Sequence, residues 1–270
     1  MEGIIKQLSG FSKIFFYSFL LVASLCLFFA CGLESYYVMD RSPSAVNVPV
    51  YTSDDPVGKY FEFYAAQNSN VGNDEFRFLG TRVYYKIYSS ASTMTSNHNS
   101  IEAVNDSTNY SAAAERMLNY GYQELYTAER GSVTPLVPNG QEGARVRIRL
   151  TNYYEESASD EAWWSNAARI EIIPSQGDEA VTRYVPRRSR GQNYSFDFGR
   201  YGKSEYSNTR INYDAPASGD EDFSGSPPSD NKYYVDMYAV AVGRDTTFAT
   251  YYSNVEYLGS VTIDASVENN

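Results

Sequence analysis

The stretch "YYVDMYAVAVG", residues 233–243, decides the fold class of this chain of 270 residues. Apolar side chains recur at every second position of it from Val235 onward, and Tyr234, Asp236 and Tyr238 alternate with the first of them. The segment "ARVRIRL", residues 144–150, has the same period, with arginine at the intervening positions. Because successive side chains of a strand point to opposite faces, both segments predict strands with one buried face.

Similar short runs cover much of the remaining chain, and clusters of Gly, Asn, Asp and Ser separate them. They are residues 46–51, 59–65, 81–88, 168–173, 195–198 and 254–263. Only residues 111–125 show helical spacing, with Ala114, Leu118 and Tyr122 recurring after Ser111, a residue that can cap a helix. The sequence therefore predicts an all-β domain with one helix.

The charge balance argues against a nucleic-acid partner. The chain carries 22 Lys and Arg against 33 Asp and Glu, a net charge of −11. Binding to phosphates requires clusters of basic side chains. The basic run "RRSR", residues 187–190, is short, and we interpret it as a loop tip.

The first thirty residues have the pattern of an export signal. Lys6 and Lys13 precede the uncharged run 14–30, and the small residue Ala30 ends it. A positive region, an apolar region and a small residue before the cleavage point are typical of a signal peptide, which we place at residues 1–30. The alternative is an uncleaved membrane anchor, because the run has nearly the length that spans a bilayer.

Both cysteines, Cys26 and Cys31, lie in the stretch "SLCLFFACG". Ala30 and Cys31 resemble the lipobox of bacterial lipoproteins, although Phe28 and Phe29 replace the leucine and the small residue that the family prefers; spirochaetes tolerate such relaxed boxes. The resemblance implies cleavage before Cys31 and acylation of Cys31, with palmitate-like chains holding the protein in the cell envelope, at the outer membrane or a periplasmic leaflet. Residues 31–45 would then be a lipidated tether, and no cysteine would remain for a disulfide or a zinc site.

Two strands resemble those of fibronectin type III-like domains. The segment 233–243 is similar to strand F, and Tyr233 takes the place of the tyrosine corner. Residues 80–88 are similar to strand C, and residues 252–263 would be strand G. The resemblance implies a fibronectin III/immunoglobulin-like β-sandwich.

In that family strands C and F are close in sequence, whereas here 144 positions separate Tyr88 and Tyr233. We therefore divide the sandwich into two halves, residues 46–90 and 230–264. Residues 91–229 become an inserted α+β subdomain that contains the helix, because so long a loop without structure is uncommon.

The outward faces of strands C and F would place four tyrosines on one surface with basic side chains. These residues are Tyr84, Tyr88, Tyr234 and Tyr238, with Arg82 and Lys86. As an exposed surface this face would bind a protein or a carbohydrate, since Tyr and Arg are enriched at recognition sites. The alternative is a packing surface on which the inserted subdomain rests.

Candidates for chemistry are few. His98 is the only histidine and lies in a polar segment that we interpret as a solvated loop, so a Ser–His or Cys–His mechanism would depend on it. Asp220, Asp222 and Ser224 resemble the opening of a calcium loop, but Asn231 stands where that loop ends in glutamate.

We expect no cofactor and no enzymatic activity. The expected function is binding or scaffolding in the bacterial envelope. The alternative is an envelope hydrolase of the glycosidase type, because a pair of carboxylates could come from the many acidic residues.

Overall fold

The computed structural model describes residues 37–265 except 54, 56–57, 128, 130–134, 152–167, 176–179, 191–192 and 199–213. The described residues belong to one compact unit, Tyr37–Asn270. The unit is predominantly β, as the period-two pattern predicts, and its strands form two large sheets and one small one.

The larger sheet is built on three long antiparallel strands, with β12 between β3 and β13. Two short strands, β4 and β6, pair with β3 in antiparallel fashion, and β11 pairs with it in parallel. The six strands are β3 (Phe76–Tyr88), β4 (Gln123–Glu124), β6 (Val137–Pro138), β11 (Phe223–Ser224), β12 (Lys232–Asp245) and β13 (Thr250–Asp264).

The second sheet has five strands in the order β1-β2-β7-β8-β9, all antiparallel. They are β1 (Ser44–Asn47), β2 (Phe61–Tyr64), β7 (Arg145–Arg149), β8 (Arg169–Ile173) and β9 (Thr182–Tyr184). The remaining strands, β5 (Tyr126–Thr127) and β10 (Pro186–Arg187), pair with each other. The segment 91–229 therefore supplies three strands of the sheet that β1 and β2 begin.

The main hydrophobic core lies between the two large sheets. Phe61, Val146 and Ile170 of the five-stranded sheet share one buried cluster with Val83 and Val235 of the six-stranded sheet. In each of these strands the alternate side chains leave the cluster, as the pleat of a strand requires. Residues 195–198 are not a strand, contrary to expectation, although Phe196 and Phe198 are fully buried in this core.

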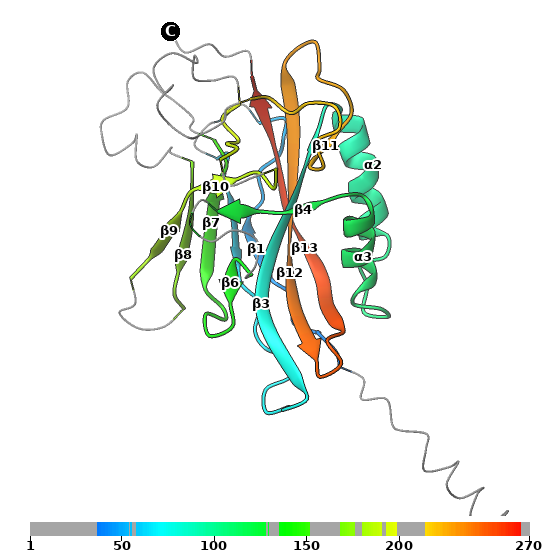
Figure 1. Cartoon of the computed structure of the whole chain (residues 1–270), viewed down its shortest axis with the longest axis vertical. Helices are drawn as coiled ribbons and strands as arrows, with labels where there is room; N and C mark the ends of the chain where they lie inside the picture. Colours follow the sequence, from blue (N-terminus) through cyan, green and yellow to red (C-terminus); the bar gives the residue numbers. More distant parts are fainter. Residues whose placement is uncertain are drawn as a thin grey trace, which may run out of the picture. The chain divides into compact units, whose positions relative to one another are not determined.

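Two helices, α2 (Ala91–Glu102) and α3 (Ala112–Asn119), cover the other face of the six-stranded sheet (Figure 1). The expectation of a single helix at 111–125 is wrong in two respects. Helix α3 ends at Asn119 because Gly121 has a φ of +79°, which a helix does not continue. Residues 123–124 then form β4.

Helix α2 has almost no sequence signal, because its residues are mostly Ser, Thr and Asn, which compete with the helix for backbone hydrogen bonds. The structure shows what stabilises it. The Ser90 hydroxyl caps its first turn by accepting the N–H of Thr93, and Met94 and Ile101 are buried against the sheet. Packing here outweighs local propensity.

Among the described residues no helix is long and apolar enough to cross a membrane. The predicted signal peptide and residues 31–36 of the tether, Cys31 among them, lie outside these residues. The rest of the predicted tether is described: Tyr37 and Met39 are buried, and β1 begins at Ser44.

Candidate functional site

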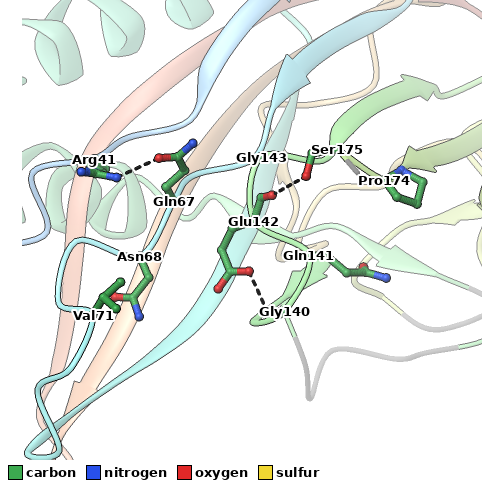
Figure 2. A pocket seen from close by; sticks show the side chains of 10 residues that line it. All are labelled: Arg41, Gln67, Asn68, Val71, Gly140, Gln141, Glu142, Gly143, Pro174 and Ser175. Carbon is green, nitrogen blue, oxygen red and sulfur yellow. Dashed lines mark hydrogen bonds between the residues drawn. The ribbon is translucent and has the colours of Figure 1, made fainter. Parts of the chain in front are cut away.

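An open depression lies at one end of the five-stranded sheet (Figure 2). Its volume is about 560 Å³, and a neighbouring hollow of about 520 Å³ shares Arg41, Gln67 and Gly143 with it. The walls come from the chain before β1, the segment after β2, the turn before β7 and the residues after β8. The lining residues are Arg41, Gln67, Asn68, Val71, Gly140, Gln141, Glu142, Gly143, Pro174 and Ser175.

The lining is held in place by polar contacts. Arg41 Nη1 donates to Gln67 Oε1 at 2.8 Å, and Ser175 Oγ donates to the Glu142 carbonyl at 3.0 Å. Glu142 Oε2 accepts the backbone N–H of Gly140 at 3.1 Å. The lining of this depression combines amides, a hydroxyl, a carboxylate and a guanidinium, which are groups that can bind a polar ligand.

An arginine face adjoins this depression on the outward side of the five-stranded sheet. We define the arginine face as Arg145 and Arg147 of β7, Arg169 of β8 and Arg183 of β9, together with Glu62 of β2 and Glu171 of β8. Glu62, Arg147, Glu171 and Arg183 form one row across four strands by their pairing register. Arg145 lies opposite Tyr64, a half-exposed residue that lines the smaller hollow.

Each glutamate of the arginine face binds two arginines through their Nε atoms. Glu62 Oε1 contacts the Nε of Arg145 and, at 3.1 Å, that of Arg147. Glu171 Oε1 contacts the Nε of Arg183 at 3.1 Å and that of Arg169 at 3.5 Å. Both carboxylates are buried, whereas the side chains of Arg145, Arg147 and Arg183 are 38%, 40% and 68% exposed.

Sequence reasoning missed the arginine face although its signal was present. Arg145, Arg147 and Arg149 alternate with apolar residues, and this alternation predicts a strand. The same alternation predicts that the three arginine side chains lie on one face of that strand. Which strands flank them, and that Glu62 and Glu171 lie between the arginines, depends on pairing that the chain order does not reveal.

The tyrosine face predicted on strands C and F exists as a row of neighbours but is not an open surface. Tyr84 lies opposite Tyr238, and Tyr88 lies opposite Tyr234. Tyr84, Tyr88 and Tyr238 are 4%, 0% and 0% exposed, because α2 and α3 pack on them. The alternative, a packing surface, is the one the structure has.

The two basic residues of this face are also engaged. Arg82 pairs with Glu124 of β4 at 3.4 Å, and burial raises the pKa of Glu124 to about 7 despite this partner. Lys86 Nζ donates to the carbonyl of Tyr120 at the end of α3. Burial lowers the pKa of Lys86, and the facing Asp236 opposes this shift.

His98 lies in helix α2 and not in a solvated loop. Its Nδ1 is 2.7 Å from the hydroxyl of Tyr238, and its ring lies 4.1 Å from that of Tyr257. Burial lowers its pKa, against the opposing effect of Glu102. Its role in the structure is to join α2 to the six-stranded sheet.

A buried network of hydrogen bonds runs from Asn97, the residue before His98 in α2, to Asp236 of β12. Asn97 of α2 donates to the Tyr88 hydroxyl at 3.2 Å, and that hydroxyl donates to Tyr122 at 3.1 Å. The Tyr122 hydroxyl donates to Asp236 Oδ2 at 2.7 Å. Within the described chain, Asp236 Oδ1 is buried without a hydrogen-bond partner.

The stability of the protein is expected to fall as the pH rises through the neutral range. Burial raises the pKa of Asp236 to about 8, against the opposing hydrogen bond from Tyr122, whereas the ordinary value is 3.8. Between these values the folded chain keeps a proton that the unfolded chain has lost, so the folded state is favoured at the acid end. From pH 6 to 7, Asp236 is expected to remove about 1 kcal/mol from the free energy of unfolding.

Denaturant unfolding of the wild type and of Asp236→Asn at pH 6 and 7 measures this contribution. The asparagine cannot titrate but still accepts the Tyr122 hydrogen bond. The decrease in stability is therefore expected to be smaller in the variant, and Glu124 contributes equally to both proteins. Equal decreases in the two proteins would contradict the assignment.

The two aspartates of the segment that resembles a calcium loop, Asp220 and Asp222, bind arginine side chains. Arg188 is fully buried, and its Nε and Nη2 donate to Asp222 at 2.9 and 2.8 Å. Its Nη2 also reaches Asp220 at 2.9 Å, and Arg190 pairs with the same carboxylate. Ser224 lies in β11 beside β3. The interpretation of residues 187–190 as a loop tip is thus wrong for Arg188, which lies in the interior.

Burial by itself lowers the pKa of Arg188, but the hydrogen bond and charge of Asp222 raise it on balance, so the guanidinium is permanently charged. Within the described chain, no group of three or more His, Cys, Asp or Glu residues could hold a metal ion. The arginine–aspartate cluster is therefore a structural ion pair between β11 and the segment after β10.

Comparison of the chain with protein-family models, with curated proteins and with solved structures finds no match.

Proposed function

We propose that this chain is an exported, lipid-anchored protein of a bacterial cell envelope that binds or scaffolds a partner. The export signal and Cys31 support the location. The polar depression beside the arginine face supports the role, because it offers fixed donors and acceptors at the surface without a catalytic arrangement in its lining. That open, polar depression is the observation that carries the proposal.

The binding region in this proposal is the outward side of the five-stranded sheet and not the tyrosine face, which helices cover. The alternative of a carboxylate-dependent hydrolase has no specific observation in its favour. Asp40 lines the smaller hollow and Glu142 lines the depression, and Glu142 already accepts a backbone hydrogen bond from Gly140.

We further propose that the fold is a fibronectin III-like β-sandwich with additions. The order β3-β12-β13 supports it, since the strands compared with C, F and G are neighbours in that order. The shared core between the two large sheets supports it as well. Strands β7, β8 and β9 would then belong to the sandwich itself, and the two helices would be the added layer.

Metabolic labelling with a fatty acid tests the location. The wild type is expected to incorporate the label and to partition with membranes, and Cys31→Ser is expected to lose both properties. Cys26→Ser is the matched control, because Cys26 lies inside the apolar run and is expected to leave labelling unchanged. Undiminished labelling of Cys31→Ser would overturn the lipid anchor.

A further inference from the structure

We infer that the arginine face is a binding site for an acidic polysaccharide, whose carboxylate or sulfate groups its guanidinium groups receive. The inference names the ligand class for the binding role proposed above and rests on that role. It does not depend on the lipid anchor.

The first argument is the orientation of the guanidinium groups. Glu62 and Glu171 hold Arg145, Arg147 and Arg183 by their Nε atoms. Within the described residues, the side-chain hydrogen bonds of these three arginines are made by Nε and none by a terminal Nη atom. A guanidinium fixed at Nε keeps several N–H groups directed away from the glutamate, in the fork that matches an oxyanion. The buried carboxylates therefore position the arginines for a second anion.

The second argument is charge. Among the described residues of the face, four arginines share two glutamates, so these six residues together carry two more positive charges than negative ones. The whole chain has a net charge of −11. A positive patch on an acidic protein directs an anion to one place and repels it elsewhere.

The third argument is spacing. Arg145 and Arg147 are two residues apart on β7, which separates their backbones by about 6.8 Å. Arg147 and Arg183 are two strands apart in one row, about 9.6 Å. An acidic polysaccharide presents a regular series of charges along its chain and can contact several of these arginines at once, whereas a single small anion would use only one arginine.

The fourth argument favours sugar over other polyanions. Tyr64 is about half exposed beside Arg145 and opens onto the smaller hollow. An aromatic ring offers an apolar face for the C–H face of a sugar. Amide and hydroxyl groups of Gln67, Asn68 and Ser175 line the neighbouring depression and can bind sugar hydroxyls.

The test measures binding of the full chain, purified in neutral detergent, to heparin and to polygalacturonate. Two probes are used because heparin presents sulfates as well as carboxylates, and polygalacturonate presents only carboxylates. The variant Arg145→Gln/Arg183→Gln leaves Glu62 with Arg147 and Glu171 with Arg169, so no buried carboxylate loses all of its partners. Its affinity for the retained polysaccharide is expected to fall roughly tenfold for each arginine removed. The salt dependence of log affinity is expected to decrease by about two.

The control is Arg77→Gln/Arg244→Gln, which removes the same charge from β3 and β12 of the other sheet. It is expected to bind as the wild type does. A second variant, Arg145→Lys/Arg183→Lys, keeps the charge but loses the fork. It is expected to bind more weakly than the wild type with an unchanged salt dependence, which tests the site even where the glutamine variant is poorly folded.

Equal binding by the glutamine variant and the wild type would overturn the inference, as would equal loss in the control. Failure of both polysaccharides to bind would also overturn it. Tighter binding to poly-glutamate or to phosphatidylglycerol vesicles would assign the face to a protein or to a membrane instead. Failure of the lipid anchor would appear only in the labelling of Cys31→Ser, so the two proposals fail separately.

Discussion

Replacement of Arg188 with methionine is expected to lower the free energy of unfolding by about 3–5 kcal/mol. The substitution leaves the buried carboxylate of Asp222 without its bidentate partner. Among the side chains that the structure describes, only the Tyr85 hydroxyl, at 2.6 Å, still donates to it. A buried charge that loses its partner costs far more than the pair contributes to stability, because the desolvation of the remaining ion is no longer offset. Urea unfolding followed by circular dichroism measures the loss.

The matched control is Arg190→Ala. Arg190 binds Asp220 in the same cluster but is 39% exposed, so its removal is expected to cost less than about 1 kcal/mol. The double variant Arg188→Met/Asp222→Leu removes both buried charges and is expected to recover much of the stability. A loss below about 1 kcal/mol for Arg188→Met would show that the cluster is open to water.

Replacement of Tyr238 with alanine is also expected to destabilise the protein by about 3–5 kcal/mol. Its ring is fully buried and lies 5.5 Å from the ring of Tyr122 and 5.1 Å from that of Tyr257. The cavity would open between the six-stranded sheet and α2, where the surrounding rings cannot close it. Thermal and denaturant unfolding measure the effect.

Tyr238→Phe separates the hydroxyl from the ring. It loses only the contact with His98 and is expected to cost about 1 kcal/mol. The double variant Tyr84→Ser/Tyr238→Ser is expected to lose more stability than Tyr238→Ala, because both residues belong to the same buried cluster. If Tyr238→Ala left the stability unchanged, the result would contradict the burial of Tyr238 and would indicate that the tyrosine face is exposed.

The period of two along the chain was enough to predict the all-β class, because alternation in "ARVRIRL" and "YYVDMYAVAVG" has no other simple explanation. It also predicted which side chains share a face, and the partners Tyr84 and Tyr238 are indeed opposite each other. The pattern could not say what lies on that face. Helix α2 covers it, and the Ser, Thr and Asn residues of that helix carry no signal of their own.

The candidate site shows the same division. The alternation of Arg145, Arg147 and Arg149 predicts a row of arginines on one face of a strand. The glutamates that orient them come from β2 and β8, which are distant in sequence from some of their partners: Glu62 and Arg147 are 85 residues apart. The pairing of distant strands depends on the total burial of the chain, and no local pattern records it.

Arg188 shows the largest difference between the sequence-based expectation and the structure, because a basic run next to glycine is normally exposed to solvent. Burial of a guanidinium is possible only where several acceptors converge on it, and here they come from Asp214, Asp220 and Asp222. Local order along the chain thus predicts most of the strands and the face that each side chain joins, and it predicts an export signal in the first thirty residues. Which faces are covered and which charges meet follows from the packing, because both depend on contacts between segments that lie far apart in the sequence.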